Sequence, residues 1–400
     1  MQKYKKLNFD DKKILDTAKE ILKKDLCNNC LGRQFAMVST GLTNKERGEK
    51  IRKNLKVKKV PDYCEICDNI FKELEEIADK TVDRLKPLDF KTLVVGTKVS
   101  HEFNLREETL WEEVEIEFCE PLKSELNREL GKLVLKKIQK LKPKVDFEPE
   151  TPDVVILLDL ENRDTRIDIN PLFVYGKYKK LVRGLPQTKW ETYKETVEDI
   201  IAKPFMKETD GREHALHGMG REDIDARCLD WRPFVFEVTK PKKREIDLKK
   251  MEKEVNKSKK VQISELKFSN KEEVRELKAA KPDKSYRILV SFEKPVTEKD
   301  MEKLKTLKGK TIQQQTPTRV MHRRANKTRP RKVKEIKWKI LKKNMVEFEV
   351  RGEAGLYVKE LIHGDQGRTK PSVAEMLGNP AKVEELDVVK IWVKLSKAGK

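Results

Sequence analysis

Four cysteines in two Cys-x-x-Cys pairs constrain this chain more than any other feature of its sequence. The pairs are Cys27 with Cys30 and Cys64 with Cys67, with 33 residues between them. Two such pairs can turn four thiolates toward one ion, which suits tetrahedral zinc. A disulfide is disfavoured in a reducing compartment, and a thioredoxin-type redox site needs one pair in a βαβ setting. We therefore predict a structural zinc site.

The long gap between the two cysteine pairs should contain a helix. Thr43 and Glu46 have the spacing of a capping box, ahead of a run that continues to Leu55. No histidine lies near the cysteines, so we expect a fully coordinated ion that is remote from any reaction. Metal binding would then contribute to the folding of this region.

The net charge of the chain indicates an anionic partner. The 400 residues carry a formal charge of +21, enough to attract a polyphosphate from a distance. Nucleic acid is the first candidate and a membrane surface the second, but apolar runs such as 154–158 are too short to span a bilayer. The N-terminus has no apolar signal-peptide core. We therefore expect a cytoplasmic protein of two or three domains.

The first part of the chain, residues 1–170, is predicted to be an α+β module. Apolar side chains at helical spacing predict helices over 11–26 and 68–87, and Ser124 is expected to cap a helix that continues to Gln139. Apolar runs and alternation predict strands over 92–95, 114–118, 153–160 and 166–169. Such a mixture suits an RNA-binding accessory domain, although fold alone does not establish that role.

A second module is expected over residues 171–400. Its first stretch, 175–190, interleaves basic residues with Tyr175, Tyr178 and Trp190. Such residues offer stacking faces and positive charge to unpaired bases. A solvated basic loop would have the same composition, and the sequence leaves both interpretations open.

Three later segments of this module carry further signals. Two charged helices are expected on either side of a strand over 261–268, followed by a strand over 285–292 that begins near Tyr286. Residues 313–332 are basic without apolar periodicity, which predicts a mobile loop that clamps an RNA backbone. Glycines divide residues 351–378 into turns around one helical turn, which bears Tyr357, Lys359 and Leu361.

The segment 220–234 concentrates the charges that could perform chemistry. Glu222, Asp223 and Asp225 lie between Arg221 and Arg227, after Gly220 and before Arg232-Pro233, which indicates a shaped turn. The Phe-Val-Phe-Glu-Val that follows is typical of a strand. A reactive carboxylate on a loop entering a sheet is one interpretation, and an ion-pair network on a polar loop is the other.

Five motifs together resemble one family. They are the cysteine pairs with Cys-Leu-Gly-Arg-Gln-Phe at 30–35, Arg-Gly-Leu-Pro-Gln-Thr-Lys-Trp at 183–190, Gly-Arg-Glu-Asp at 220–223, Pro-Thr-Arg-Val-Met-His-Arg-Arg at 317–324 and Ala-Gly-Leu-Tyr-Val-Lys-Glu-Leu-Ile-His-Gly-Asp at 354–365. In this order they resemble the archaeal Pus-ten (PusX) family of tRNA pseudouridine synthases. The resemblance covers nearly the whole chain. It implies a zinc-bearing, THUMP-like RNA-binding domain over 1–170 and a mixed-sheet pseudouridine synthase domain over 171–400.

The resemblance also implies an activity and its residues. The expected reaction is isomerisation of uridine 55, and also uridine 54, in the TΨC arm of tRNA by a monomer without an organic cofactor. Asp223 matches the catalytic aspartate, Tyr286 the active-site tyrosine and Lys359 the basic partner of the aspartate, with Leu361 and Leu377 as apolar neighbours. The expected substrate contacts are Tyr286, Tyr357, Leu361, Arg183, Lys189, Arg319, Arg323 and Arg324, and the expected zinc ligands are Cys27, Cys30, Cys64 and Cys67.

Several alternatives stay open at this point. Asp225 rivals Asp223, because in an extended segment both acids would lie on the same face. The carboxylate could attack the sugar C1′, attack the base, or assist removal of the 2′ proton. A non-catalytic tRNA-binding protein and a THUMP-bearing methyltransferase or thiolase are the competing classes. Against the rival enzymes, the chain lacks a clear glycine-rich nucleotide-binding loop.

Overall fold

The computed structural model describes residues 7–190 and 192–393. The chain divides into two units. Unit 1 comprises the residues up to Pro171 together with Lys240–Arg244, and unit 2 comprises Leu172–Thr239 and the residues from Glu245 onward. Both units mix helices with strands, which confirms the predicted α+β class. Within the described ranges, no helix is long and apolar enough to cross a bilayer.

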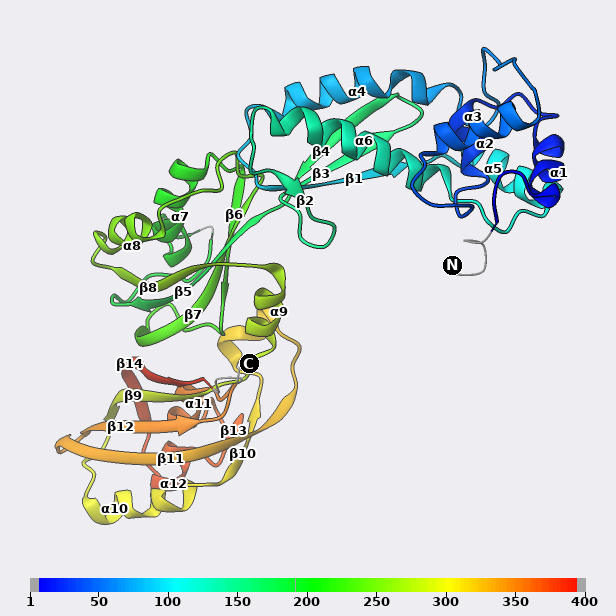
Figure 1. The fold of residues 1–400 in the computed structure, drawn as a ribbon. Helices are drawn as coiled ribbons and strands as arrows, with labels where there is room; N and C mark the ends of the chain where they lie inside the picture. Colours follow the sequence, from blue (N-terminus) through cyan, green and yellow to red (C-terminus); the bar gives the residue numbers. More distant parts are fainter. Residues whose placement is uncertain (1–6, 191, 394–400) are drawn as a thin grey trace. The chain divides into compact units, whose positions relative to one another are not determined.

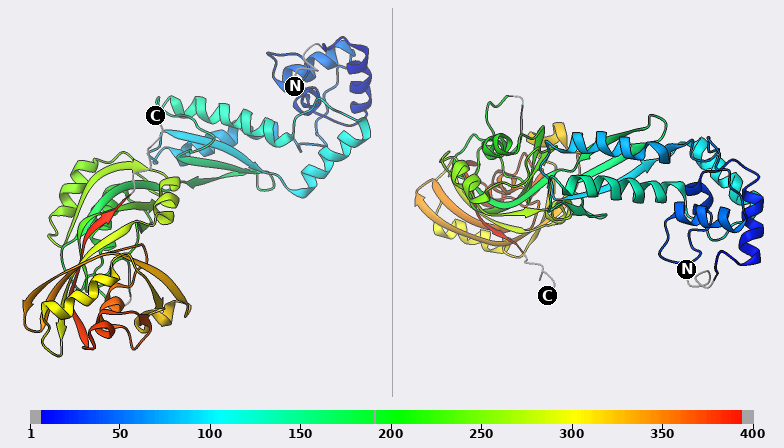
Figure 2. Two further views of the ribbon diagram at one scale, coloured as in Figure 1. Left: turned by 90° about the horizontal axis from the view of Figure 1, so that it is seen from below. Right: turned by 45° about the horizontal axis from the view of Figure 1, so that its top comes forward.

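Unit 1 has a small sheet with two long helices packed along it. The strands β1 (Thr92–Lys98), β2 (Asp146–Phe147), β3 (Val154–Asp159) and β4 (Asp164–Ile169) lie in the order β2-β1-β3-β4. The helices α4 (Ile70–Leu85) and α6 (Leu122–Gln139) pack against each other and against these strands, as Figure 1 and the right view of Figure 2 show. Apolar residues at alternate positions of β1 and β3 form the core beneath the helices.

Four further helices surround the cysteine-rich region of unit 1. They are α1 (Lys12–Ile21), α2 (Asn28–Arg33), α3 (Asn44–Asn54) and α5 (His101–Val114). Helix α3 lies in the gap between the cysteine pairs and begins with the capping box of Thr43 and Glu46, as predicted. Helix α1 ends at Ile21, earlier than the apolar spacing indicated. Helix α6 begins at Leu122, after Pro121, so the predicted cap at Ser124 is wrong. The free N–H group of Leu122 donates to the carboxylate of Glu107.

The strand predicted over residues 114–118 is wrong. Helix α5 ends at Val114, and Glu115 has a left-handed conformation with φ +48°. Phe118 is buried in the following loop, where its ring stacks on Phe35 at 5.5 Å between centroids. Alternation over five residues cannot distinguish a strand from a helix end followed by one buried loop residue.

A short segment from much later in the sequence completes unit 1. Residues Lys240–Arg244 follow the first run of unit 2, Leu172–Thr239, and return to unit 1. Asp89 N donates to the carbonyl of Lys242 at 2.9 Å, and Arg244 N donates to the carboxylate of Asp89 at 2.8 Å. The guanidinium of Arg244 also lies 2.8 Å from the carboxylate of Asp153. Unit 1 is therefore discontinuous in sequence.

Unit 2 is organised by one ten-stranded sheet (Figure 1). The strand order is β13-β10-β11-β12-β9-β14-β7-β5-β8, and β6 pairs with β7. Neighbouring strands are antiparallel except β7 and β14, which run parallel where Arg227 pairs with Asp387 and Cys228 with Val388. This pair joins two halves, each with its own hydrophobic core.

The β5–β8 half contains the first four strands and three helices of unit 2. They are β5 (Leu172–Lys180), α7 (Val197–Thr209), β6 (Glu213–Gly218), β7 (Arg227–Thr239), α8 (Leu248–Asn256), β8 (Val261–Ser269) and α9 (Lys271–Ala279). The predicted pair of charged helices around strand 261–268 is confirmed by α8, β8 and α9. Arg232 and Pro233, taken from the sequence as part of a turn, lie inside β7, so the acidic loop ends at Ala226.

The β9–β14 half contains the remaining elements. They are β9 (Asp283–Phe292), α10 (Glu298–Glu302), η2 (Lys303–Leu307), β10 (Thr311–Gln315), η3 (Thr318–Arg323), β11 (Thr328–Lys342), β12 (Met345–Gly352), α11 (Val358–His363), β13 (Thr369–Lys370), α12 (Val373–Leu377) and β14 (Ala381–Trp392). Helix α11 is the predicted helical turn between glycines.

The connection predicted over residues 313–332 is shorter than expected, and the prediction is wrong at both ends. Strand β10 continues to Gln315 and β11 begins at Thr328, so only the segment between them, which includes η3, connects the strands. The ladder forms through backbone groups, which a basic sequence can supply without apolar alternation. The amide of Gln314 adds to this order, because it donates to the carbonyl of Tyr357 at 2.8 Å and accepts from Tyr357 N at 2.9 Å.

Two glycines in unit 1 allow helices α2 and α3 to cross at backbone contact. A Cβ atom at Gly48 would lie 2.1 Å from the carbonyl oxygen of Asn28, and one at Gly32 would lie 1.8 Å from that of Asn44. We predict that Gly48→Ala lowers the free energy of unfolding by at least about 1–3 kcal/mol, the usual cost of overpacking.

A matched glycine supplies the control for this prediction. Gly131 lies inside α6, where an added Cβ would make only ordinary contact with Val95 at 3.7 Å. Gly131→Ala should therefore be neutral or stabilising by up to about 1 kcal/mol, since alanine favours a helix. Denaturant unfolding of the full chain measures both, and equal effects of the two substitutions would contradict the close crossing.

Candidate active site

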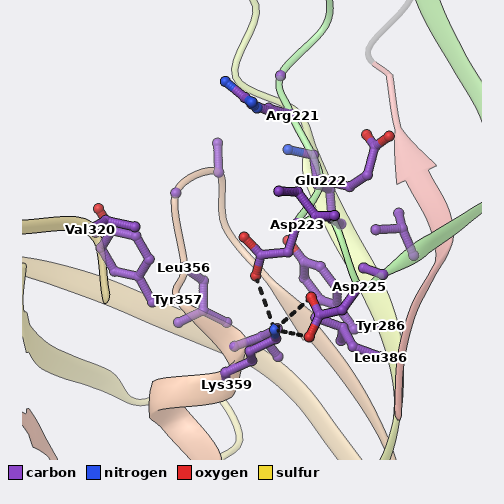
Figure 3. Close-up of a pocket in the computed structure, with 18 of the residues that line it drawn as sticks. Arg221, Glu222, Asp223, Asp225, Tyr286, Val320, Leu356, Tyr357, Lys359 and Leu386 are labelled. Atoms are coloured by element: carbon purple, nitrogen blue, oxygen red, sulfur yellow. Dashed lines mark hydrogen bonds and ion pairs between the residues drawn. The ribbon is translucent and has the colours of Figure 1, made fainter. Parts of the chain in front are cut away.

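A pocket of ≈ 510 Å³ lies in unit 2 where the two halves of the sheet meet. Its walls are the loop before β7, the start of β9, and the segments around η3 and α11. Figure 3 shows Asp223 and Asp225 directed toward Lys359, with Tyr286 close behind them. The chain therefore brings together the three residues that the sequence assigned to catalysis, from elements far apart in the sequence.

Buried Asp387 joins the two halves of the sheet beside this pocket. Arg227 donates Nε and Nη2 to its carboxylate at 2.9 and 2.7 Å, and Arg183 Nη2 lies 2.8 Å from Oδ1. Burial would raise the pKa of Asp387, but hydrogen bonds from Arg227 and Arg287 hold it below its usual value. The Asp387 carboxylate therefore stays ionised and anchors β14 beside β7.

The two candidate acids share one lysine but differ in their other partners. Asp225 accepts from Lys359 Nζ at 2.6 and 2.8 Å, whereas Asp223 Oδ2 lies 3.6 Å from the same atom. Asp223 Oδ1 instead accepts from Arg319 Nη1 at 2.9 Å. The side chain of Asp223 is 28% exposed and that of Asp225 is 67% exposed. Asp223 is thus the more enclosed acid, held between two cations.

Neighbouring charges favour the charged forms of Asp225 and Arg319. Although burial opposes it, the hydrogen bond and charge of Lys359 lower the pKa of Asp225. Burial would likewise lower the pKa of Arg319, but Glu360 and Asp223 raise it above its usual value. Arg319 Nε donates to buried Glu360 at 2.8 Å, while Nη1 donates to Asp223. Glu360 therefore holds the guanidinium in the position from which it contacts Asp223.

Tyr286 forms an apolar wall of the pocket. It pairs across β9 and β14 with Val388 and packs against Cys228. Burial raises the pKa of Tyr286 to about 12, so its hydroxyl stays protonated at neutral pH. The side chain therefore offers an uncharged ring and a hydroxyl donor near Asp223.

The predicted substrate contacts divide between the pocket and other places. Tyr357 and Arg324 line the pocket with Arg319, and Arg324 Nη1 donates to the Tyr357 hydroxyl at 2.8 Å. The others lie elsewhere: Leu361 and Leu377 pack in the core of the β9–β14 half, Arg183 anchors β14, and Lys189 is exposed outside the pocket lining. The side chain of Arg323 lies outside the described part of the chain.

A buried polar network beneath the acidic loop was not identified from the sequence. Glu222 is fully buried, with Arg232 Nε 3.1 Å away and the Tyr178 hydroxyl donating to it at 3.0 Å. Lys180 Nζ donates to the carbonyls of Leu185, Asp223 and Ile224 at 2.8 to 3.1 Å. The network therefore holds the loop by both a side chain and its backbone.

Two residues of this network were interpreted from the sequence as part of an RNA-binding stretch. Tyr178 and Lys180 are fully buried in β5, so neither can contact RNA, and for Tyr178 the stacking role is wrong. The available signal was their period of two with Leu172 and Val174, which places all four on one face of the strand. Trp190, in contrast, lines the pocket beneath Arg221, whose guanidinium lies 5.9 Å from the ring centroid.

The four cysteines of unit 1 form a cluster that can hold a metal ion. Their Sγ atoms all lie within 4.8 Å of one another, and those of Cys27 and Cys67 are 3.7 Å apart. Four thiolates about 2.3 Å from a tetrahedral zinc would be separated by about 3.8 Å. Arg33 Nη1 also lies 3.4 Å from Cys30 Sγ, where its charge would compensate a thiolate. The donor set therefore fits a four-thiolate site.

Comparison with family models and curated proteins gives consistent matches. The model described as Pus10, C-terminal, matches residues 173–392, and the model described as Pus10 THUMP domain, archaeal, matches residues 77–159. The tRNA pseudouridine synthase Pus10 of Pyrococcus furiosus is 38% identical, over 94% of this chain and 98% of its own length. The one from Methanothrix thermoacetophila is 38% identical, over 94% of each chain.

A weaker likeness exists among solved structures. A Cbf5-Nop10-Gar1 complex contains a chain that aligns with 54% of this chain, over 48% of its own length, at 19% identity. The TM-score is 0.33, too low to support a conclusion about the site.

We predict that Glu222→Gln destabilises unit 2 strongly. The substitution leaves the Arg232 charge buried without its carboxylate, and breaking a buried pair in this way costs about 3–5 kcal/mol. Thermal unfolding should therefore show a clear fall in Tm. Glu254→Gln is the control, because Glu254 pairs with Lys257 on the exposed side of α8 and its loss should leave Tm unchanged. Similar Tm values for both variants would contradict a structural role of the network.

Proposed function

The chain belongs to the Pus10 family and is therefore a pseudouridine synthase, an isomerase, and from this premise we propose that it acts on uridines 54 and 55 in the TΨC arm of tRNA, with Asp223 as its catalytic residue. The observation that carries the proposal is the enclosed position of Asp223 between Arg319 and Lys359, facing a pocket that also contains Tyr286. An enzyme with this substrate would act in the cytoplasm.

The reaction that this site must perform needs no redox partner. The N1–C1′ bond of uridine breaks, the base turns while it is held, and a C5–C1′ bond forms. C5 loses its proton and N1 gains one, so atoms and electrons balance within the nucleotide and its solvent. This balance explains why we propose no organic cofactor.

Each residue of the site has a role that suits this reaction. The Asp223 carboxylate can attack C1′, attack the base, or accept the 2′ proton, and Arg319 and Lys359 lie beside it. Tyr286 can stack on the base while it rotates. The target base must leave its stack, which costs a few kcal/mol, and the basic and aromatic side chains Arg324 and Tyr357 can offset this cost.

The proposal extends to unit 1 and to the organisation of the chain. We propose that residues 1–170 form a zinc-bearing, THUMP-like accessory domain that binds tRNA, and that residues 171–400 form the catalytic domain of a monomer. The match of the archaeal THUMP model and the geometry of the cysteine cluster support this division. Four thiolates leave no open coordination position, so the ion would stabilise the fold and take no part in the chemistry.

We predict that Asp223→Ala abolishes turnover while tRNA binding stays nearly intact. Loss of a nucleophile or general base should lower kcat by at least about a thousandfold. The measurement is incubation with an unmodified tRNA transcript, followed by pseudouridine mapping at single-nucleotide resolution and a binding titration.

Asp225→Ala is the matched variant for this assignment. It removes the closer partner of Lys359 but leaves Asp223 between Arg319 and Lys359, so pseudouridine should still form at positions 54 and 55 at a reduced rate. An inactive Asp225→Ala beside an active Asp223→Ala would reassign the catalytic residue. Pseudouridine outside the TΨC arm would reject the proposed target.

We predict one zinc ion per chain, measurable by elemental analysis of the purified protein. Cys64→Ser should release the metal and lower Tm, because metal binding contributes to the folding of the cluster. Cys119→Ser is the control, since this cysteine belongs to the same unit but not to the cluster. Full zinc content in Cys64→Ser, or a different metal in the wild type, would reject the zinc assignment.

A further inference from the structure

Lys284 is a cation in the wall of the pocket that the reaction described above does not use. It lies on β9 two residues before Tyr286, so both side chains leave the same face of the strand and both line the pocket. The intervening Ser285 and the preceding Asp283 face the other way. On that other face, the Asp283 carboxylate pairs with Lys334 Nζ at 2.6 Å and with Arg351 Nη2 at 3.1 Å.

Lys284 differs from the other lysine of the pocket in having no counter-charge. Lys359 pairs with Asp223 and Asp225, and the pocket arginine Arg319 pairs with Asp223 and Glu360. Among the residues that the structure describes, no carboxylate or other hydrogen-bond acceptor lies within bonding distance of Lys284 Nζ. The nearby carboxylate of Glu222 pairs with Arg232 instead.

The acidic loop is shaped to leave room for this ammonium group. Gly220, at the start of the loop, has φ +76°, which glycine adopts without strain. A Cβ atom at this position would lie 2.8 Å from Lys284 Nζ and 3.4 Å from Arg232 Nη1. The glycine therefore permits the lysine to lie against the loop that carries Asp223.

The surroundings make the charge on Lys284 costly while the pocket is empty. Burial and, to a smaller extent, the Arg232 charge lower the pKa of Lys284 to about 8, against the opposing effects of Cys228 and Glu222. Lys284 is half-buried, and a cation held there only for structure would have a partner, because an unpaired and partly desolvated charge destabilises a fold. The unpaired Lys284 is therefore suited to bind an anionic group of the substrate.

We propose that Lys284 binds a backbone phosphate of the RNA next to the target uridine, while Tyr286 holds the base. This inference rests on the proposed function and adds to it a residue that positions the nucleotide. Side chains two residues apart on one strand face are separated by about 6.6–6.8 Å, which leaves room for the sugar between base and phosphate. A phosphate carries the full charge that offsets a desolvated ammonium, whereas a uracil carbonyl does not.

The experiment measures tRNA binding by wild type, Lys284→Gln and Lys284→Arg over a series of salt concentrations. A lost phosphate contact should weaken binding and reduce the slope of log Kd against log salt concentration by about 0.7–0.9 in Lys284→Gln. Lys284→Arg should keep the wild-type slope. Lys299→Gln, an exposed lysine on α10 outside the pocket lining, is the control and should change neither quantity.

The pH dependence of binding gives a second readout. Below pH 8 the lysine is charged with or without RNA, but above pH 8 the free protein must take up a proton to bind the phosphate. Wild-type affinity should therefore fall as the pH rises through about 8. Lys284→Arg and Lys284→Gln should lack this step, because the first stays charged and the second has no charge to gain.

Protein stability separates this role from a structural one. Removal of an unpaired, half-buried charge should leave the Tm of Lys284→Gln unchanged or raise it. A lower Tm with an unchanged salt slope would overturn the proposal and make Lys284 a structural cation. An unchanged slope with a lower kcat would also overturn it, in favour of a contact to the neutral base. Failure of the proposed function is distinct, because wild-type protein would then form no pseudouridine.

Discussion

The ion pair between Glu222 and Arg232 beneath the acidic loop is the interaction on which the geometry of the pocket depends. Glu222 turns into the core while its neighbour Asp223 turns into the pocket, so the position of the acid follows from the buried partner of the residue before it. The Lys180 ammonium donates to the carbonyls of Asp223 and Ile224 in this loop and to that of Leu185 beside it. Buried charges that do not contact the substrate thus fix the position of the Asp223 carboxylate.

The pocket also depends on the single parallel contact in the sheet. The β5–β8 half supplies the carboxylates, and the β9–β14 half supplies Arg319, Lys359 and Tyr286. Asp387 and Arg227 fix the two halves at the join, a short distance from the acids along β14 and β7. The ion pairs of Arg319 and Lys359 with the two acids also cross between the halves, so charge pairs connect the halves both at the join and in the pocket.

The sequence predicted the features that rest on local rules. Cysteine spacing, the capping box at Thr43, and segments with clear periodicity such as α8, β8 and β9 were predicted correctly because neighbours in sequence determine them. The strand at 114–118 and both ends of the loop at 313–332 were predicted wrongly, because tertiary burial and backbone pairing determine these segments. Tyr178 and Lys180 were misassigned because their composition matches an RNA-binding surface. Their period of two with Leu172 and Val174 indicated burial, but the partner Glu222 lies 44 residues from Tyr178 in the sequence.

The return of Lys240–Arg244 to unit 1 has a consequence for the way this chain is made. Asp89 and Asp153 lie in the first part of the chain, but Arg244, which bonds to both, leaves the ribosome long after them. Unit 1 therefore cannot complete its hydrogen bonds until the first strands of unit 2 have been synthesised. A fragment that ends at Pro171 would lack the hydrogen bonds of Lys240–Arg244. Unit 1 therefore consists of two separate segments of the sequence and cannot be separated from unit 2 at a single position.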